Sequence, residues 1–233
     1  MSTADVSKSK SHRPLHTGRS GKRVAVERAA TQVPGAAVTN GTFLYGGADR
    51  IINRRRDLEN ICHQLLVTLG EDPTRPGLKD TPRRWAAMWE EFIGYDPGNI
   101  DTVFESVTTD QMVVVSGMRV FSNCEHHLLP FWCDVSVGYV TGKRVLGLSK
   151  FARIAHKVAH KLQIQERLVQ EIADQVSSLT GTQDVAVIAK GQHLCMLMRG
   201  IKTPGEMTTS IMRGVFRKDR QAREEFLLLS GVR

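Results

Sequence analysis

The spacing of hydrophobic side chains divides the chain into helical and extended stretches. From about Ile51 to Leu69, apolar residues recur every three or four positions, which predicts an amphipathic helix. The segment "GEDPTRPGLKDTP" then breaks the pattern with three prolines and two glycines, as loops do. A second helix is predicted with Thr81 as its N-cap and Pro82 as its first helical residue. The stripes that these helices should bury comprise Ile52, Leu58, Ile61, Cys62, Leu65 and Leu66, then Trp85, Met88, Trp89 and Phe92.

The hydrophobic period changes to two from about Met112, which predicts strands. The run "FWCDVSVGYV" alternates so that every second side chain from Phe131 to Tyr139 lies on one apolar face. Cys133 belongs to that face, so we interpret it as a structural thiol. Trp132 belongs to the opposite face, which could meet a neighbouring subunit.

Helical spacing returns at "GLSKFARI", where Ser149 is the predicted N-cap, and continues to about Leu179 with an interruption at "KLQIQERL". The runs "VAVIAKG", "HLCMLMRG" and "MTTSIMRGVF" are predicted as strands, and "DRQAREEFLLLS" as a closing helix. Strands, a long helical pair and further strands predict an α+β fold. In that fold an antiparallel sheet has the helical pair on one face.

Composition and charge are those of a globular protein with a basic N-terminal tail. Hydrophobic residues make up 41% and charged residues 24% of the 233 positions. Of the net charge of +8, residues 1–50 carry +5, from eight Lys/Arg against three Asp/Glu. We therefore predict a disordered tail over 1–47, with a transit peptide as the alternative, and a catalytic domain over 48–233. This domain would comprise a helical part (48–108) and a sheet part (109–233).

The charge distribution and the absence of long apolar runs limit the partners and the compartment. Because most of the basic excess lies in the tail, nucleic-acid binding is not expected. No apolar run reaches the ~20 residues of a membrane span, so no membrane partner is expected either. We expect a cytoplasmic protein, whose four cysteines stay reduced and are available for metal binding or catalysis.

A metal site is predicted from two separated motifs. Cys124 and His127 have the short C-x-x-H spacing of zinc ligands. In "HLCMLMRG", strand alternation would put His193, Cys195, Leu197 and Arg199 on one face, which supplies Cys195 as a third ligand. Three protein ligands leave a coordination position for water, as in catalytic zinc sites, whereas a further histidine ligand would make the site structural. The alternative without any ion is a buried cysteine beside hydrogen-bonded histidines.

Two more histidines and a glutamate accompany the predicted ligands. His126 and His193 could transfer protons near neutral pH, and the alternative for either is a bracing or core histidine. Glu125 is expected to lie in solvent.

Five motifs together resemble the signatures of GTP cyclohydrolase I. They are "SNCEHHLLPF", "GLSKFARI", "QIQERLVQEIA", "HLCMLMRG" and "MTTSIMRGVF", and the resemblance extends over about residues 50–233. It implies zinc on Cys124, His127 and Cys195, and hydrolysis of GTP to 7,8-dihydroneopterin triphosphate and formate, the entry step to folate and other pterins such as tetrahydrobiopterin. It also implies the tunnelling fold, with subunits that join their sheets into a barrel and form a homodecamer of two stacked pentamers.

The resemblance also implies roles for individual residues. Ser149 would lie near the ribose and act in a later stage. For the implied reaction, strand geometry makes His193 our candidate to protonate a ring nitrogen, and His126 our candidate to assist ring opening or formyl release. Glu166 would bind the donor edge of guanine, and Gln165 would add a polar contact. The triphosphate needs cations, and the sequence offers Lys150 and Arg153 at a predicted helix start and Arg199 on the predicted face of His193 and Cys195. A solvated charged face is the alternative for Glu166 and for Arg153, and neither the downstream pathway nor a regulatory protein can be read from the chain.

Three other functions share part of this evidence. A zinc deaminase also uses Cys and His ligands, but its H-x-E…P-C-x-x-C signature does not occur in the sequence. A nucleic-acid module with structural zinc would need four protein ligands and a basic core. A different tunnelling-fold enzyme acting on a pterin or deazapurine would not need all five motifs.

Overall fold

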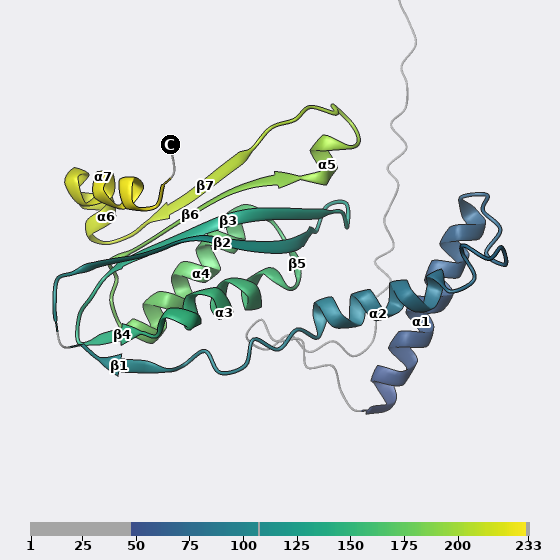
Figure 1. Ribbon diagram of the computed structural model, residues 1–233, viewed down its shortest axis with the longest axis horizontal. Coiled ribbons are helices and arrows are strands. Elements are labelled where there is room, and N and C mark those ends of the chain that lie inside the picture. The colour runs from purple at the N-terminus through teal and green to yellow at the C-terminus, as the bar shows by residue number, and fades with distance from the viewer. Residues whose placement is uncertain (1–47, 107, 232–233) are drawn as a thin grey trace, which may run out of the picture. The chain divides into compact units, whose positions relative to one another are not determined.

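The computed structural model describes residues 48–106 and 108–231 (Figure 1). The predicted tail of residues 1–47 lies outside this part of the chain. Within the described residues, no helix combines the length and the apolar character that a membrane crossing requires.

Two helices form the N-terminal part, as predicted. Helix α1 (Ala48–Thr68) packs against α2 (Thr81–Ile93), and Arg55 Nε lies 3.6 Å from Glu90 Oε2 between them. The predicted N-cap was wrong by one residue, because Asp80 holds that position and Thr81 is already helical. The predicted apolar stripes of these two helices are unevenly buried. Cys62 and Trp89 are buried, whereas Ile61 and Met88 are 56% and 47% exposed. The predicted core stripes are therefore only partly buried within one chain.

A five-stranded sheet forms the centre of the rest of the chain, in the order β5-β2-β3-β6-β7. Its strands are β2 (Met112–Cys124), β3 (Pro130–Val140), β5 (Leu162–Gln163), β6 (Val185–His193) and β7 (Met207–Met212). Neighbours are antiparallel except for the short β5, which runs parallel to β2. The predicted antiparallel sheet is thus corrected to a mixed one. A separate ribbon of β1 (Val103–Glu105) and β4 (Arg144–Leu146) was not predicted.

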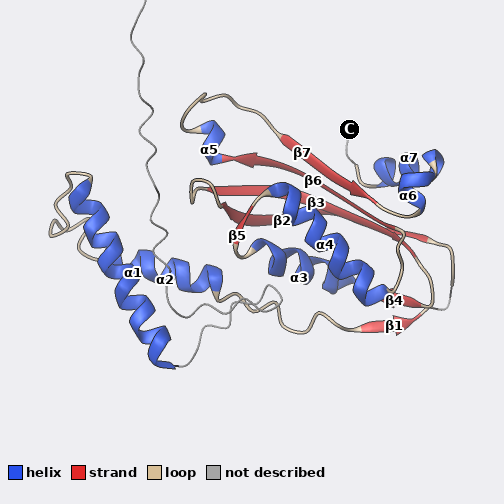
Figure 2. Cartoon of the chain, turned by 180° about the vertical axis from the view of Figure 1, so that it is seen from behind, coloured by secondary structure: helices blue, strands red, loops and turns tan. Residues whose placement is uncertain are grey.

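Helices α3 (Leu148–Ala159) and α4 (Gln165–Thr180) cover one face of the sheet, as Figure 2 shows from behind. The predicted apolar face of β3 is confirmed, because Phe131, Cys133, Val135, Val137 and Tyr139 are all buried. Burial raises the pKa of the Cys133 thiol to about 12, which agrees with its interpretation as structural.

The other face of the sheet is partly covered too, which the sequence interpretation did not foresee. Phe216 of α6 (Val215–Lys218) and Phe226 of α7 (Arg220–Leu229) are buried against Ala186 and Ile188 of β6. Because both faces of β6 are covered there, its first five residues, Val185 to Ala189, are all apolar and buried instead of alternating. The predicted strand "MTTSIMRGVF" accordingly ends at Met212, and its last residues begin α6.

Ring contacts join the end of α2 to α3. Tyr95 stacks on His160 with 3.9 Å between ring centroids, and His160 Nδ1 donates to the His156 carbonyl at 2.7 Å. A hollow of about 410 Å³ opens beside them, lined also by Glu91 and Phe121. Burial, and then the neighbouring His160, lower the pKa of His156 below its usual value.

The lowered pKa of His156 predicts that acid destabilises the folded chain. Below the ordinary histidine pKa of about 6.5, the unfolded chain binds a proton at His156 more readily than the folded chain. The free energy of unfolding should therefore fall as pH falls from about 7.5 to 5.5, and His156→Gln should reduce that fall. Thermal midpoints of both proteins across this range provide the test, and identical pH slopes would contradict the prediction.

Candidate metal and catalytic site

The first two predicted ligands meet at the turn that follows β2. Cys124 ends the strand, and its carbonyl accepts hydrogen bonds from the N–H groups of His127 at 3.3 Å and Leu128 at 2.8 Å. Leu128 takes a left-handed conformation with φ of 54°, which closes the turn. The imidazole thereby returns to the thiol, with His127 Nδ1 3.9 Å from Cys124 Sγ.

The third predicted ligand reaches the same place by a different route from the one expected. The predicted strand through "HLCMLMRG" was wrong, because β6 ends at His193 and Leu194–Leu197 form a short helix, α5. The pairing of β6 with β3 ends at His193, which lies opposite Phe131, the second residue of β3. The following residues are good helix formers and turn away from the sheet.

Cys124, His127 and Cys195 form a compact cluster of donor atoms. Their ligating atoms all lie within 4.8 Å of one another, and among the described residues no other Cys, His, Asp or Glu joins them. Tetrahedral zinc with sulfur ligands at 2.3 Å separates neighbouring donors by about 3.8 Å. The donor types and spacing therefore fit a metal ion with three protein ligands.

The electrostatics of Cys195 reflect this crowding. Burial raises the pKa of its thiol, the adjacent Cys124 raises it further, and Arg199 opposes both effects. Arg199 is thus close enough to influence the cluster, although it lies after α5 and not on a shared strand face.

His193 lies beside the cluster in a fixed setting. Its ring stacks on Phe131 with centroids 4.5 Å apart and planes inclined by 5°. Its Nε2 lies 2.9 Å from Oε1 of Gln165, whose side chain is fully buried. Burial lowers the pKa of His193, and the negative charge of Glu166 partly offsets this. The side chain of Gln165 forms its hydrogen bonds within the protein. Its direct contact with a substrate stays a prediction.

His126 is more open to solvent than His193. Its side chain is 65% exposed, and its Nε2 lies 4.0 Å from Glu125 Oε1. Glu125 is not simply solvated, as the sequence suggested, because Arg167 forms an ion pair with it. Arg167 lies on α4, so no local motif could have indicated this contact.

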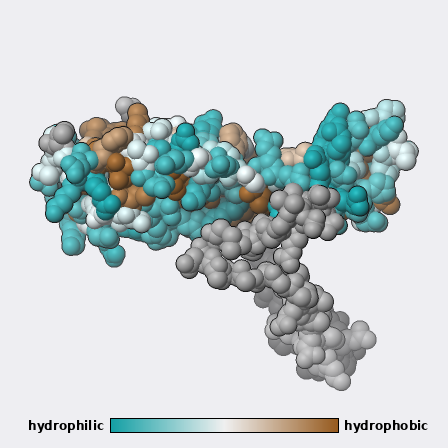
Figure 3. All heavy atoms as spheres, turned by 90° about the horizontal axis from the view of Figure 1, so that it is seen from below, coloured by the Kyte–Doolittle hydropathy of each residue, from teal (hydrophilic) through white to brown (hydrophobic). Residues whose placement is uncertain are grey.

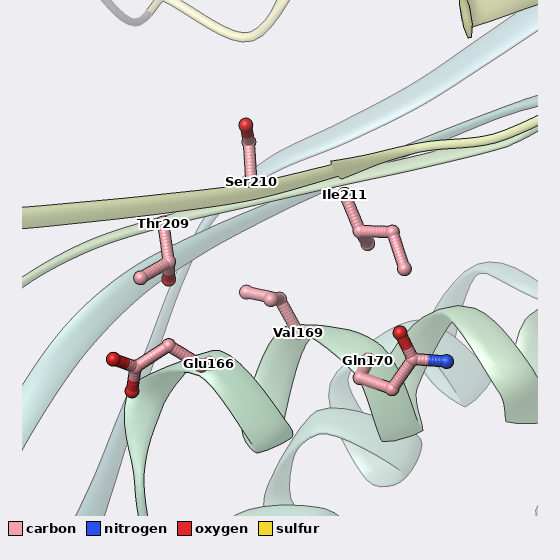
Figure 4. Close-up of a pocket in the computed structure, with 6 residues that line it drawn as sticks. All are labelled: Glu166, Val169, Gln170, Thr209, Ser210 and Ile211. Atoms are coloured by element: carbon pink, nitrogen blue, oxygen red, sulfur yellow. The ribbon is translucent and has the colours of Figure 1, made fainter.

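Glu166 borders a hollow of about 230 Å³ between the first turns of α4 and strand β7. Figure 4 shows Thr209 and Ile211 pointing from β7 toward α4, whereas Ser210 points away. The Glu166 side chain stands at one end of this group, and the residue is exposed. The hollow therefore offers a carboxylate that can accept hydrogen bonds from a ligand.

Ser149 and Lys150 lie at the start of α3, and Arg153 lies half-way along this helix. Helix α3 starts at Leu148 with Gly147 as its N-cap, so the prediction of Ser149 as N-cap was wrong. The C-terminal end of α3 leads to β5, where Gln163 pairs with Cys124. Twelve helical residues span about 18 Å, which separates the start of α3 from the metal cluster.

Both predicted phosphate-binding cations of α3 contact neutral carbonyls in the linker after α2. Lys150 Nζ donates to the Asn99 carbonyl at 2.7 Å, and Arg153 donates to the Pro97 carbonyl. A phosphate could replace such partners, because hydrogen bonds between charged groups are stronger than those to a neutral carbonyl.

Comparison with known proteins identifies close relatives over most of the chain. The family model described as GTP cyclohydrolase I matches residues 58–231. A GTP cyclohydrolase 1 of Hyperthermus butylicus is 46% identical over 169 residues, which are 72% of this chain and 86% of the relative. A GTP cyclohydrolase 1 of Aquifex aeolicus is 46% identical over 180 residues, 76% of this chain and 98% of the relative.

The comparison with solved structures is much weaker. The apo form of the archaeosine synthase QueF-Like matches 44% of this chain and 95% of its own, with 19% identity and a TM-score of 0.34. A likeness at this level supports no conclusion about fold or function.

The close approach of β3 and β6 beside His193 predicts the effect of a small substitution. A methyl group on Gly191 would lie 2.6 Å from Cys133 Cβ and would also clash with the Trp132 carbonyl. Gly191→Ala should lower the free energy of unfolding by about 1–3 kcal/mol, the usual cost of overpacking. Gly142→Ala is the matched control, because nothing lies within 4 Å of its added methyl. Equal denaturation midpoints for the two variants would contradict the prediction.

Proposed function

The chain belongs to the GTP cyclohydrolase I family, and we propose that it hydrolyses GTP to 7,8-dihydroneopterin triphosphate and formate. The observation that carries this proposal is the cluster of Cys124, His127 and Cys195 beside His193. The product would enter folate or other pterin synthesis.

We propose zinc as the metal of this cluster. Two thiolates and one imidazole are ligands that zinc favours, and three protein ligands are usual in its catalytic sites. When bound, zinc would supply a Lewis acid that lowers the pKa of a water molecule toward neutrality. The protein's own contribution is to hold the three donors close together at the ends of β2 and β6.

Recognition of guanine would fall to Glu166. The N1–H and N2–H₂ groups of guanine are donors that one carboxylate can accept as a pair. Glu166 supports this role because it is exposed, borders the hollow, and lies near enough to His193 to affect its pKa. Adenine has no matching donor pair, so the same carboxylate would discriminate against ATP.

The proton transfers would use His193 and His126, and the ribose stage would use Ser149. His193 is held in place by Phe131 and Gln165, which suits a group that must exchange a proton in one geometry. His126 is exposed, with Nε2 4.0 Å from Glu125 Oε1, so it could approach the substrate from the solvent side.

We propose that the complete site needs more than one subunit. The start of α3, with Ser149 and Lys150, is separated by the helix length from the metal cluster of the same chain, and Arg153 lies half-way along the helix. A neighbouring copy would bring its own α3 to the triphosphate, together with Arg199 from this chain. The family's barrel of joined sheets, in a decamer of two pentamers, would provide that neighbour.

Two surface features of the described chain support such an assembly. Strands β5 and β7 stand at the sheet edges, where backbone groups could pair with another copy. Leu148, Ile201 and Leu228 are 74%, 75% and 81% exposed, and Figure 3 shows brown apolar side chains among the polar ones on one face. Apolar groups left at a monomer's surface often mark contacts between subunits.

The direct experiment is incubation of purified protein of known metal content with GTP. Formate and the fluorescence of the oxidised pterin should appear together. Ammonia without formate would indicate a deaminase instead, and the absence of both products would exclude the proposed activity.

Cys195→Ser tests the metal assignment. The variant should lose zinc and at least about 100-fold in turnover, since a hydroxyl is a poorer zinc ligand than a thiolate. It should keep its helical content, because the side chain is only partly buried at the edge of the core and serine is nearly the same size as cysteine. Cys62→Ser, a buried thiol of the N-terminal helices, is the control and should keep its zinc. Full zinc occupancy in Cys195→Ser would contradict the assignment.

Glu166→Gln tests the guanine contact. Loss of a charge-assisted pair of hydrogen bonds should raise KM for GTP by about 10- to 100-fold. The thermal midpoint should change little, because the residue is exposed. Glu105→Gln, another exposed carboxylate, serves as the control. An unchanged KM for GTP in Glu166→Gln would argue against this contact.

A further inference from the structure

A fully buried amide stands between the sheet and His193. Gln165 is the first residue of α4, and its side chain has 0% exposure. Its Nε2 lies 3.0 Å from the Ala189 carbonyl, 2.8 Å from the Met207 carbonyl and 3.1 Å from Thr209 Oγ1. Its Oε1 lies 2.9 Å from His193 Nε2. All polar atoms of this side chain are therefore in use inside the protein.

These partners determine which end of the amide is nitrogen. The carbonyls of Ala189 and Met207 can only accept hydrogen bonds, so the atom that faces both must be the NH₂ group. The atom that faces His193 is then the amide oxygen, which can only accept. A reversed amide would place its oxygen against two carbonyl oxygens and leave a buried group unsatisfied.

The orientation of the amide in turn fixes the histidine. Because Oε1 of Gln165 only accepts, Nε2 of His193 must carry a hydrogen. In the neutral ring the lone pair then lies on Nδ1. The stack on Phe131, with planes inclined by only 5°, opposes tilting of the ring away from this arrangement.

We propose that Gln165 is a positioning residue that holds neutral His193 as the Nε2–H tautomer and leaves Nδ1 as its proton-exchanging nitrogen. The inference rests on the proposed function for the identity of the reaction. A proton passed between His193 and the substrate then leaves from or arrives at Nδ1, while the Nε2 hydrogen stays on Gln165. Gln165 acts through His193 and not on the substrate, in contrast to its predicted substrate contact.

The tautomer can be observed directly in the wild-type, zinc-loaded protein. Solid-state NMR of protein labelled with ¹³C and ¹⁵N in its histidine rings distinguishes the nitrogens, since Nε2 is bonded to Cδ2 and Nδ1 to Cγ. The signals of His193 are those missing from a His193→Asn sample. Neutral His193 should carry its hydrogen on Nε2. A hydrogen on Nδ1 would overturn the inference, whatever the enzyme's activity.

A kinetic comparison tests the consequence. Gln165→Leu should lower kcat by about 10- to 100-fold, the usual effect of losing a group that orients a catalytic or ligating histidine. Its KM for GTP and its zinc content should stay within about threefold of wild type. A rise in KM with kcat unchanged would mean that Gln165 contacts the substrate, and would overturn the positioning role, as would an unchanged kcat.

Gln163→Leu is the matched control for loss of a buried amide. Gln163 is also 0% exposed, and its side chain bonds to the Val158 carbonyl, Glu171 and the Ile164 N–H instead of a histidine. This variant should lose stability but keep kcat, per folded and zinc-loaded subunit, within about threefold.

If Gln165→Leu does not fold, the NMR measurement decides alone. If wild-type protein releases no formate, the proposed function fails, and the NMR result still judges the tautomer.

Discussion

The antiparallel pairing of β3 with both β2 and β6 is the constraint on which the site depends. Phe131 lies opposite Ser122 on one side and His193 on the other, so one residue fixes the ends of two neighbouring strands. Cys124 ends the first of these strands, and Cys195 lies two residues after the end of the second, in the short helix α5. A shift of one residue in either pairing would turn every side chain of that strand to the opposite face and separate the donors.

Support for the site extends from this sheet into α4. The helix begins where β5 pairs with the end of β2, so its first residues lie beside the cluster. Gln165 points inward to His193, Glu166 borders the open hollow, and Arg167 holds Glu125. Three consecutive residues thus face the interior, the open hollow and the turn that carries Cys124 and His127. Contacts that orient metal-binding or acid–base groups typically contribute about 10- to 100-fold to metal affinity or activity.

Local patterns in the sequence were sufficient for much of the fold, because periodicity reports which face of an element is buried. The alternation from Phe131 to Tyr139 and the helices α2 and α4 were found in this way. The place of Cys195 beside Cys124 and His127 was also predicted, but through a strand that the structure replaces with α5, because periodicity cannot show where a partner strand begins. Contacts between distant positions, such as Gln165 with His193, leave no local pattern. The separation of Ser149 from the cluster likewise follows only from the direction of α3.

Zinc-edge X-ray absorption spectroscopy of the purified, active protein tests the central claim most directly, since it reports the atoms around the metal. The account predicts one zinc per subunit, with two sulfur neighbours at about 2.3 Å and two nitrogen or oxygen neighbours at about 2.0–2.1 Å. One of the lighter neighbours should exchange when a competing small ligand is added. A shell of three or four sulfurs, a shell that no added ligand alters, or active protein without a stoichiometric metal would contradict it.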